Sequence, residues 1–182
     1  MNKTKLRSKL ILSAVVVVLI FILVPAAAAA KSTKLDFNAI ETYAGVPDFP
    51  VPDAFMFIAG QTTHIKGFWS YHLLEDATIG DDIITGYTFS IFHVKMNMVT
   101  GNWVLNGKTL FNLTWYYSID DSIVELKGYF TGTINAKLVG GKISGSFTLQ
   151  GFEAFEGMKL KGIVWSISPS TNGLSGTILI PD

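Results

Sequence analysis

The stretch that decides the fold is residues 103–119, which read WVLNGKTLFNLTWYYSI. Its odd positions are mostly large and apolar, among them Trp103, Leu105, Phe111 and Leu113, and its even positions are mostly polar, as at Asn106. Successive side chains of a β-strand point to opposite faces, so this alternation predicts a strand with one buried face and one solvated face.

The same period of two continues on both sides of this stretch. Together with residues 103–119 it predicts seven strands, the other six being Ile65–Leu74, Ile83–Val99, Ile123–Val139, Lys142–Gln150, Met158–Ser168 and Leu174–Ile180. Ala54–Ala59 is a candidate for an eighth strand. Turn-forming residues, such as Gly140-Gly141, separate the strands. No stretch of residues 31–182 has a helical apolar period, and we therefore expect an all-β domain.

Strand length and glycine placement favour a closed barrel over a two-sheet sandwich. Several predicted strands exceed the usual length of about 5–6 residues. Most of them carry a glycine near the middle, as at Gly67, Gly107, Gly145 and Gly162. A central glycine lets a strand coil sharply enough to close a barrel. The sequence therefore predicts a single up-and-down antiparallel barrel of about eight long strands, with a sandwich as the alternative.

The amino terminus has the composition of an export signal. Four basic residues between Lys3 and Lys9 precede an apolar run from Leu10 to Val24, and Pro25 and five alanines follow. These are the parts of a secretory signal peptide, so we expect a hydrophobic signal helix to precede the barrel. We expect residues 1–30 to be a signal peptide or an uncleaved anchor, 31–53 a Pro-containing irregular lead-in, and 54–182 the barrel. The domain is then exported, either secreted or held at the cell envelope, and an uncleaved anchor would be its contact with a membrane.

Charge and cysteine content narrow the classes of function. Residues 31–182 hold 10 lysines, no arginine and 14 acids. Nucleic-acid binding needs a clustered basic surface, so we expect no nucleic-acid partner. The chain has no cysteine, which excludes disulfides and thiolate metal sites. The oligomeric state stays open.

Alternation alone does not say which face of the barrel is apolar. A membrane barrel turns its apolar face to lipid, whereas a barrel in water turns it inward. The polar positions are rich in Thr, Ser and Lys, and the strands exceed the roughly 9–11 residues that span a bilayer. These features favour a soluble barrel, with a small membrane barrel as the alternative.

Two segments resemble known barrel families. Residues Phe155–Gly162, followed by Gly173–Thr177, resemble the closing hairpins of allene oxide cyclase-like and dirigent-like barrels over about residues 100–180. This resemblance implies a barrel with an apolar cavity, but no catalytic residue of those families can be carried over. Gly67-Phe68-Trp69 is similar to the Gly-x-Trp of lipocalins, although the lipocalin arginine is missing.

Residues that could act in catalysis or bind a metal are few and scattered along the sequence. His64, His72 and His93 show no metal-ligand spacing, and the acids around Ala77–Gly80 do not match a calcium loop. We expect no catalytic group, no metal and no cofactor. Asn112-Leu113-Thr114 is an acceptor sequon for N-glycosylation at Asn112.

The aromatic residues carry the remaining functional signal. Six of them are expected to face the barrel interior and to contact a ligand, namely Trp69, Tyr71, Trp103, Phe111, Trp115 and Tyr117. An eight-stranded barrel can hold one small ligand or can be filled by its own side chains. The sequence therefore predicts a non-enzymatic domain that binds a small apolar ligand or has a structural role in the cell envelope. The alternative is an allene oxide cyclase-like isomerase that acts on an apolar substrate in the cavity.

Overall fold

A computed structural model describes residues 32–120 and 122–181. Residues Thr33–Pro181 form one compact unit. The predicted signal peptide or anchor in residues 1–30 lies outside the described residues. Within the described part of the chain, no helix is long and apolar enough to cross a membrane.

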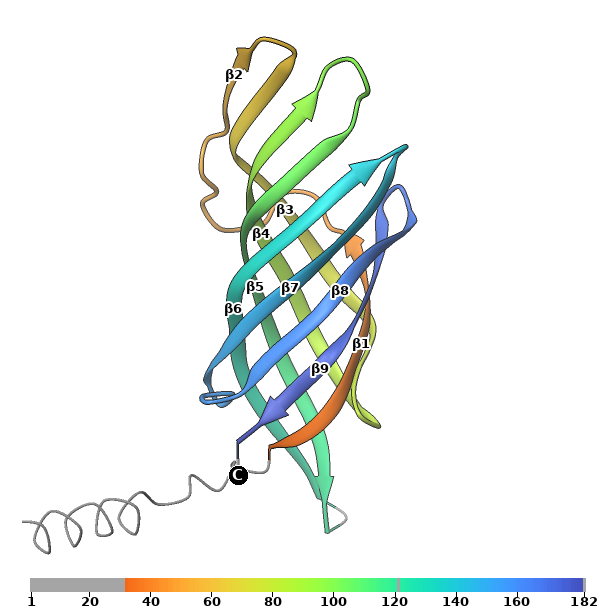
Figure 1. Cartoon of the computed structure of the whole chain (residues 1–182). Coiled ribbons are helices and arrows are strands. Elements are labelled where there is room, and N and C mark those ends of the chain that lie inside the picture. Colours follow the sequence, from red (N-terminus) through yellow and green to blue (C-terminus); the bar gives the residue numbers. More distant parts are fainter. Residues whose placement is uncertain (1–31, 121, 182) are drawn as a thin grey trace, which may run out of the picture. The chain divides into compact units, whose positions relative to one another are not determined.

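Eight antiparallel strands close into a barrel, and a ninth extends one of them (Figure 1). Neighbours around the ring follow chain order, and β1 closes it by pairing with both β9 and β3. β2 pairs only with the first residues of β3, beyond the ring. The prediction of an all-β, up-and-down antiparallel barrel is confirmed. The strands are β1 (Thr33–Tyr43), β2 (Phe55–Ala59), β3 (Thr62–Ile79), β4 (Asp82–Asn97), β5 (Trp103–Ile119), β6 (Ser122–Val139), β7 (Lys142–Glu153), β8 (Lys159–Ser168) and β9 (Thr171–Ile180).

The barrel begins earlier in the chain than the sequence pattern suggested. β1 lies inside residues 31–53, which we expected to be an irregular lead-in, and it closes the ring. Phe37 and Ala39 of β1 are buried at alternating positions, but the next inward position is Glu41. Because this inward acid interrupts the apolar alternation, the sequence pattern did not predict β1 as a strand. Phe55–Ala59 is indeed a strand, but it lies outside the closed ring.

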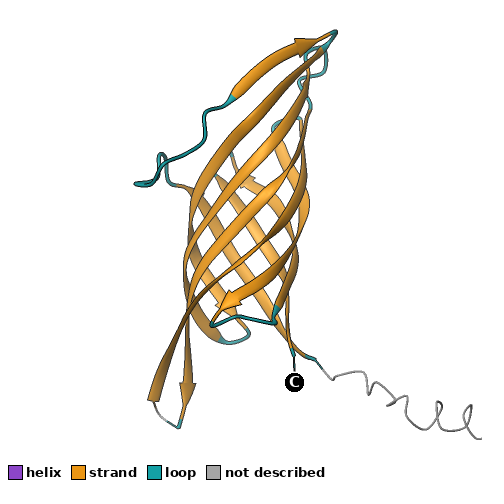
Figure 2. Cartoon of the chain, turned by 90° about the vertical axis from the view of Figure 1, so that its left-hand side faces the viewer, coloured by secondary structure: helices purple, strands orange, loops and turns teal. Residues whose placement is uncertain are grey.

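The segment between β1 and β2 runs outside the strands (Figure 2). Phe49, near its middle, packs on aromatic rings of β3 and β4, with centroids 6.0 Å from Tyr71 and 5.1 Å from Phe89. A Cβ on Gly67 would lie 2.7 Å from the carbonyl oxygen of Asp53. Glycine at position 67 therefore lets this segment, here called the outer strap (residues 44–54), lie close against β3.

Two irregularities in β3 change which of its residues face inward. Before Gly67 the inward positions are odd, and Thr63 is buried. The register shifts between Lys66 and Phe68, where Gly67 has a φ of 74°, and the inward positions become even. A second shift between Leu73 and Ala77 restores the odd positions. A β-bulge adds one unpaired residue, and this exchanges the two faces of the strand beyond it.

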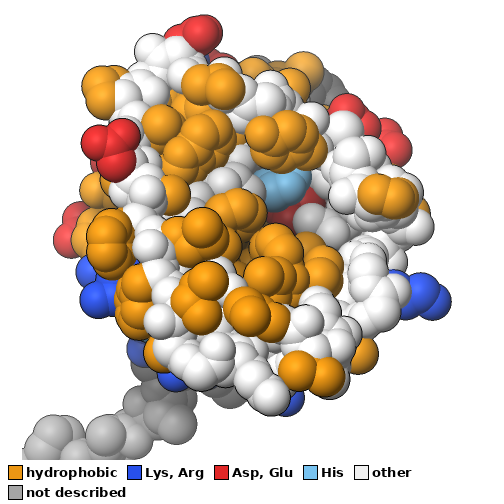
Figure 3. Space-filling model, turned by 90° about the horizontal axis from the view of Figure 1, so that it is seen from above, with side chains coloured by type: hydrophobic (Ala, Val, Ile, Leu, Met, Phe, Trp, Pro, Cys, Tyr) orange, Lys and Arg blue, Asp and Glu red, His pale blue; other side chains and the backbone are white. Residues whose placement is uncertain are grey.

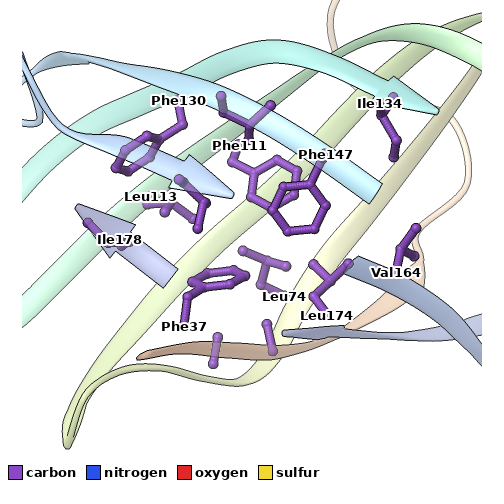
Figure 4. Packing of buried hydrophobic residues seen from close by; sticks show 14 of the residues in the cluster. Phe37, Leu74, Phe111, Leu113, Phe130, Ile134, Phe147, Val164, Leu174 and Ile178 are labelled. Carbon is purple, nitrogen blue, oxygen red and sulfur yellow. The ribbon is translucent and has the colours of Figure 1, made fainter. Parts of the chain in front are cut away.

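The half of the barrel that contains the start of β1 and the end of β9 is filled with side chains (Figure 4). Phe111 lies at its centre, with ring centroids 6.1 Å from Phe37 and 5.2 Å from Phe147. Phe155, from the turn between β7 and β8, is fully buried and stacks on Phe130 at 5.1 Å. We call this half the closed end, because Phe155 plugs it.

The outward positions of β5, β6 and β7 are predominantly polar. They include Asn106, Asn112, Thr114, Thr131, Thr133, Asn135, Ser144, Ser146, Thr148 and Gln150. The buried apolar residues alternate with them along the same strands. The apolar face of these three strands is therefore the inner one.

Candidate functional site

A cavity of about 520 Å³ occupies the half of the barrel opposite the Phe155 plug. It opens at the end that carries the β4–β5, β6–β7 and β8–β9 turns, here called the open end. Figure 3 looks into this end and shows a hollow in which a histidine and an acidic side chain are visible among hydrophobic ones. His72 and Glu41 are the histidine and the acid that line the cavity.

One side of the cavity is apolar. Strands β5 to β8 supply it, and the packed core forms its floor through Phe111 and Leu174. The apolar lining of these four strands consists of Trp103, Leu105, Phe111, Ile134, Ala136, Leu138, Ile143 and Val164. Such a wall can hold a hydrocarbon or aromatic group by excluding it from water.

The opposite side of the cavity carries a buried carboxylate. Glu41 of β1 is only 7% exposed. Its Oε2 accepts a hydrogen bond of 2.9 Å from the Thr88 hydroxyl, and its Oε1 accepts one of 2.9 Å from the Asn172 amide. A buried carboxylate is costly unless polar partners surround it, and β4 and β9 supply these partners. Each oxygen has lone pairs for a further donor.

More polar groups continue from this carboxylate across the cavity wall. The Ser90 hydroxyl donates a hydrogen bond of 2.7 Å to the Thr109 hydroxyl, and both side chains are buried and line the cavity. Ser70 and His72 of β3 line the same side. The cavity therefore has an apolar half and a half in which these polar groups lie among aromatic residues such as Phe68 and Phe92, here called the polar half. Such a lining suits a molecule that is itself amphipathic.

The six aromatic residues expected to face the interior divide into three groups. Trp103 and Phe111 line the cavity. Trp115 and Tyr117 also face inward but lie towards the closed end, outside the cavity lining, and the Trp115 indole donates a hydrogen bond of 3.0 Å to Asp82.

For the third group, Trp69 and Tyr71, the structure corrects the prediction. Trp69 and Tyr71 pair with Ile91 and Phe89, outward residues of β4, so the expectation that they face inward is wrong. The Trp69 ring lies 6.4 Å from Phe89, although Trp69 also borders the cavity, and Tyr71 packs under the outer strap. The bulge at Gly67 is the cause, because it shifts the inward positions of β3 by one residue.

The remaining candidates lie on the outer face of the barrel, where His93 is half-buried. Asn112 is exposed and faces outward from β5. The rings of His64 and His93 lie 5.8 Å apart on the outside of β3 and β4, where Phe57 stacks on His64 at 4.7 Å. Among residues 32–120 and 122–181, no group of three histidine or acidic side chains is arranged to hold a metal ion.

Sequence reasoning missed the polar half of the cavity. Its members come from five strands, and Glu41 and Asn172 are 131 residues apart. One signal was available, because Glu41 continues the odd-numbered series Leu35, Phe37 and Ala39. An acid at a position that should face a core marks either a strand end or a buried polar site.

Comparison with known proteins does not assign the chain to a family. The sequence matches no protein-family model, and no curated protein shows significant sequence similarity to it.

Proposed function

We propose that this protein is a non-enzymatic carrier that binds one small amphipathic molecule, mainly apolar with one polar group, inside the barrel. The observation that carries the proposal is the half-filled interior, with a cavity of about 520 Å³ above a packed floor. Protein pockets for small molecules typically enclose about 300–1,000 Å³. A purely structural barrel of eight strands can fill its interior with side chains.

The polar half of the cavity defines the polar group that the ligand carries. Glu41 is the acid in the lining, and its two oxygens already accept hydrogen bonds from Thr88 and Asn172. A ligand hydroxyl or amine can donate a further hydrogen bond to the carboxylate. The apolar part of the ligand would then lie against Trp103, Leu105 and Ile143.

A test is to fill the cavity from one strand and to compare both faces of that strand. Ala136 of β6 is buried and lines the cavity, whereas its neighbour Asn135 faces outward. We expect Ala136→Trp to abolish binding of a fluorescent hydrophobic probe and Asn135→Trp to leave it unchanged. Ala136→Leu, a milder filling, serves if the tryptophan variant does not fold.

Ligand occupancy gives a second readout. Native mass spectrometry of the purified protein should show a bound organic molecule, or should show one after incubation with a long-chain alcohol or amine. A wild-type protein that binds neither probe nor ligand would contradict the carrier proposal and would favour the structural role in the cell envelope.

We further propose that the barrel works in water outside the cytoplasm. The polar outward positions of β5 to β7 support an aqueous setting over a lipid one. The signal-like composition of residues 1–30 supports export. Fractionation of cells that express the full chain tests both statements, because recovery of the barrel in the cytoplasm, or only in detergent extracts, would contradict them.

One observation favours a second candidate, a cyclase or isomerase of the allene oxide cyclase type. A buried carboxylate next to an apolar wall can hold or move a proton on a bound substrate. Glu41→Gln separates the two candidates: an enzyme would lose turnover of its substrate and keep binding, whereas a carrier would show no turnover in either form.

A further inference from the structure

The open end of the barrel carries large apolar side chains at the tips of its hairpins. On β2, Met56 and Ile58 are each 63% exposed, and in the β4–β5 turn Val99 is 70% exposed. Val139, next to the β6–β7 turn, and Ile167, near the end of β8, are also exposed. Figure 3 shows hydrophobic side chains spread around the hollow at this end. Exposed apolar clusters of this kind mark surfaces that contact another molecule or a membrane.

Lysines surround these tips on the outer wall. Two of them lie on either side of Val104 on the outer face of the sheet. Val104 of β5 pairs with Lys95 of β4 and with Lys137 of β6. Lys66 on β3 and Lys142 on β7 are exposed at the same end. Among the described residues, the acids on the outside of this end are Asp48 and Asp53 of the outer strap.

The closed end is predominantly acidic, although it also carries Lys34, Lys127 and Lys159. It also exposes isoleucines, with Ile119 at 48% and Ile123 at 77% exposure, but acids surround them. The acids at or near this end include Asp36, Asp81, Asp82, Asp120, Glu125 and Glu156. Apolar exposure is therefore common to both ends, and the basic surroundings distinguish the open end.

We propose that the open end docks on an anionic lipid bilayer, with Met56, Ile58 and Val99 entering the interface and the lysines contacting the headgroups. Apolar groups that enter the interface and basic side chains that attract anionic lipids are the two parts of peripheral membrane binding. A bilayer fits the observations better than a protein partner does, because the exposed apolar groups come from several separate hairpins and lysines surround them.

Docking in this orientation turns the mouth of the cavity toward the lipid. The proposal does not depend on the cavity being occupied, because it concerns the outer tips. It also goes beyond our expectation from the sequence, in which only an uncleaved N-terminal segment would contact a membrane. If the carrier function is correct, its ligand can pass between bilayer and barrel without crossing water.

The test is vesicle co-sedimentation of residues 32–182, a segment that excludes the apolar N-terminal run and contains the whole ring of strands and its core. We expect binding to vesicles of phosphatidylserine and phosphatidylcholine, and much weaker binding to phosphatidylcholine alone. Lys95→Gln with Lys137→Gln should reduce the partition coefficient about fivefold per lysine. Met56→Ser with Ile58→Ser should reduce it by about tenfold or more.

The closed end offers matched controls with the same chemistry. Lys127→Gln with Lys159→Gln, and Ile119→Ser with Ile123→Ser, should leave vesicle binding unchanged. The proposal is overturned if wild-type protein does not bind anionic vesicles, or if the closed-end variants lose binding as the open-end variants do. It is also overturned if the Met56 and Ile58 change instead abolishes a dimer seen by sedimentation, since a second copy would then be the occupant. Probe binding in the cavity, measured on the same variants, separates these outcomes from failure of the carrier proposal.

Discussion

The Asn172 amide donates a hydrogen bond of 2.9 Å to Oε1 of Glu41, across the seam where the last strand of the barrel pairs with the first. Both side chains are buried and line the cavity. The bond therefore satisfies the carboxylate of the proposed binding site and also joins the two ends of the domain.

Removing this carboxylate should destabilise the barrel measurably. Glu41→Ala leaves the Thr88 hydroxyl and the Asn172 amide without their acceptor, and an unsatisfied buried polar group costs about 1–3 kcal/mol. Urea unfolding checks the change. A double-mutant cycle with Asn172→Ala should give a coupling of about 0.5–3 kcal/mol. The matched control is Glu75→Ala. The Glu75 carboxylate accepts a hydrogen bond from Thr42 on the exposed outer surface, so this substitution should lower the free energy of unfolding by less than about 0.5 kcal/mol.

Phe155 and Phe152 offer a second matched pair, three residues apart. Phe155 is fully buried and stacked on Phe130, whereas Phe152 is 39% exposed and stacked on Tyr129 outside the barrel. Phe155→Ala should lower the free energy of unfolding by about 3–5 kcal/mol, because it opens the plugged end. Phe152→Ala should cost about 1 kcal/mol. Equal losses in the two variants would show that Phe155 is not a plug.

The barrel should lose stability in mild acid through His93. Burial lowers the pKa of His93 below 6.5, and the nearby His64, Lys66 and Lys95 lower it further. The folded protein then binds a proton at this site less readily than the unfolded chain does. The free energy of unfolding should therefore fall as the pH drops below about 6.5 and level off below the folded-state pKa.

Unfolding of wild type and His93→Gln at pH 7.5 and at lower pH checks this account. The Gln variant should lose less stability on acidification than wild type does. An identical pH dependence in the two proteins would assign the acid sensitivity to other groups.

The outer strap should open locally without unfolding of the barrel. Phe49 contacts Tyr71, Tyr87 and Phe89 and is itself 37% exposed. Phe49→Ala removes this attachment, so residues 44–54 should become more sensitive to proteolysis, with global stability lowered by about 1–2 kcal/mol. Val46→Ala is the control, since Val46 is 73% exposed in the same segment. A barrel that unfolds together with the strap would contradict this expectation.

The alternation along strands such as β5 and β6, together with strand length and central glycines, predicted an antiparallel barrel of about eight strands. The count was right but one member was not, because β1 closes the ring and Phe55–Ala59 lies outside it. What the pattern could not predict depends on single residues. Gly67 and Asp76 have positive φ and lie in the two irregularities of β3, and each exchanges inward for outward positions. Trp69 and Tyr71 were placed on the wrong face for that reason.

The cavity was equally hidden from the pattern. Alternation identifies which side chains face inward but not how they fill the space. The filled half depends on Phe155, which comes from a turn and belongs to no strand. The hollow half depends on polar pairs such as Ser90 and Thr109, which meet only after β4 and β5 pair.

The plug at Phe155 restricts how the proposed ligand could enter and leave the barrel. With that end sealed, the ligand of the proposed carrier would have to leave by the route through which it entered. The end of the molecule that enters first is then the last to leave. A proposed ligand longer than the cavity would keep its trailing end outside, so the depth from the mouth to Phe111 would set the length of ligand that the barrel can enclose.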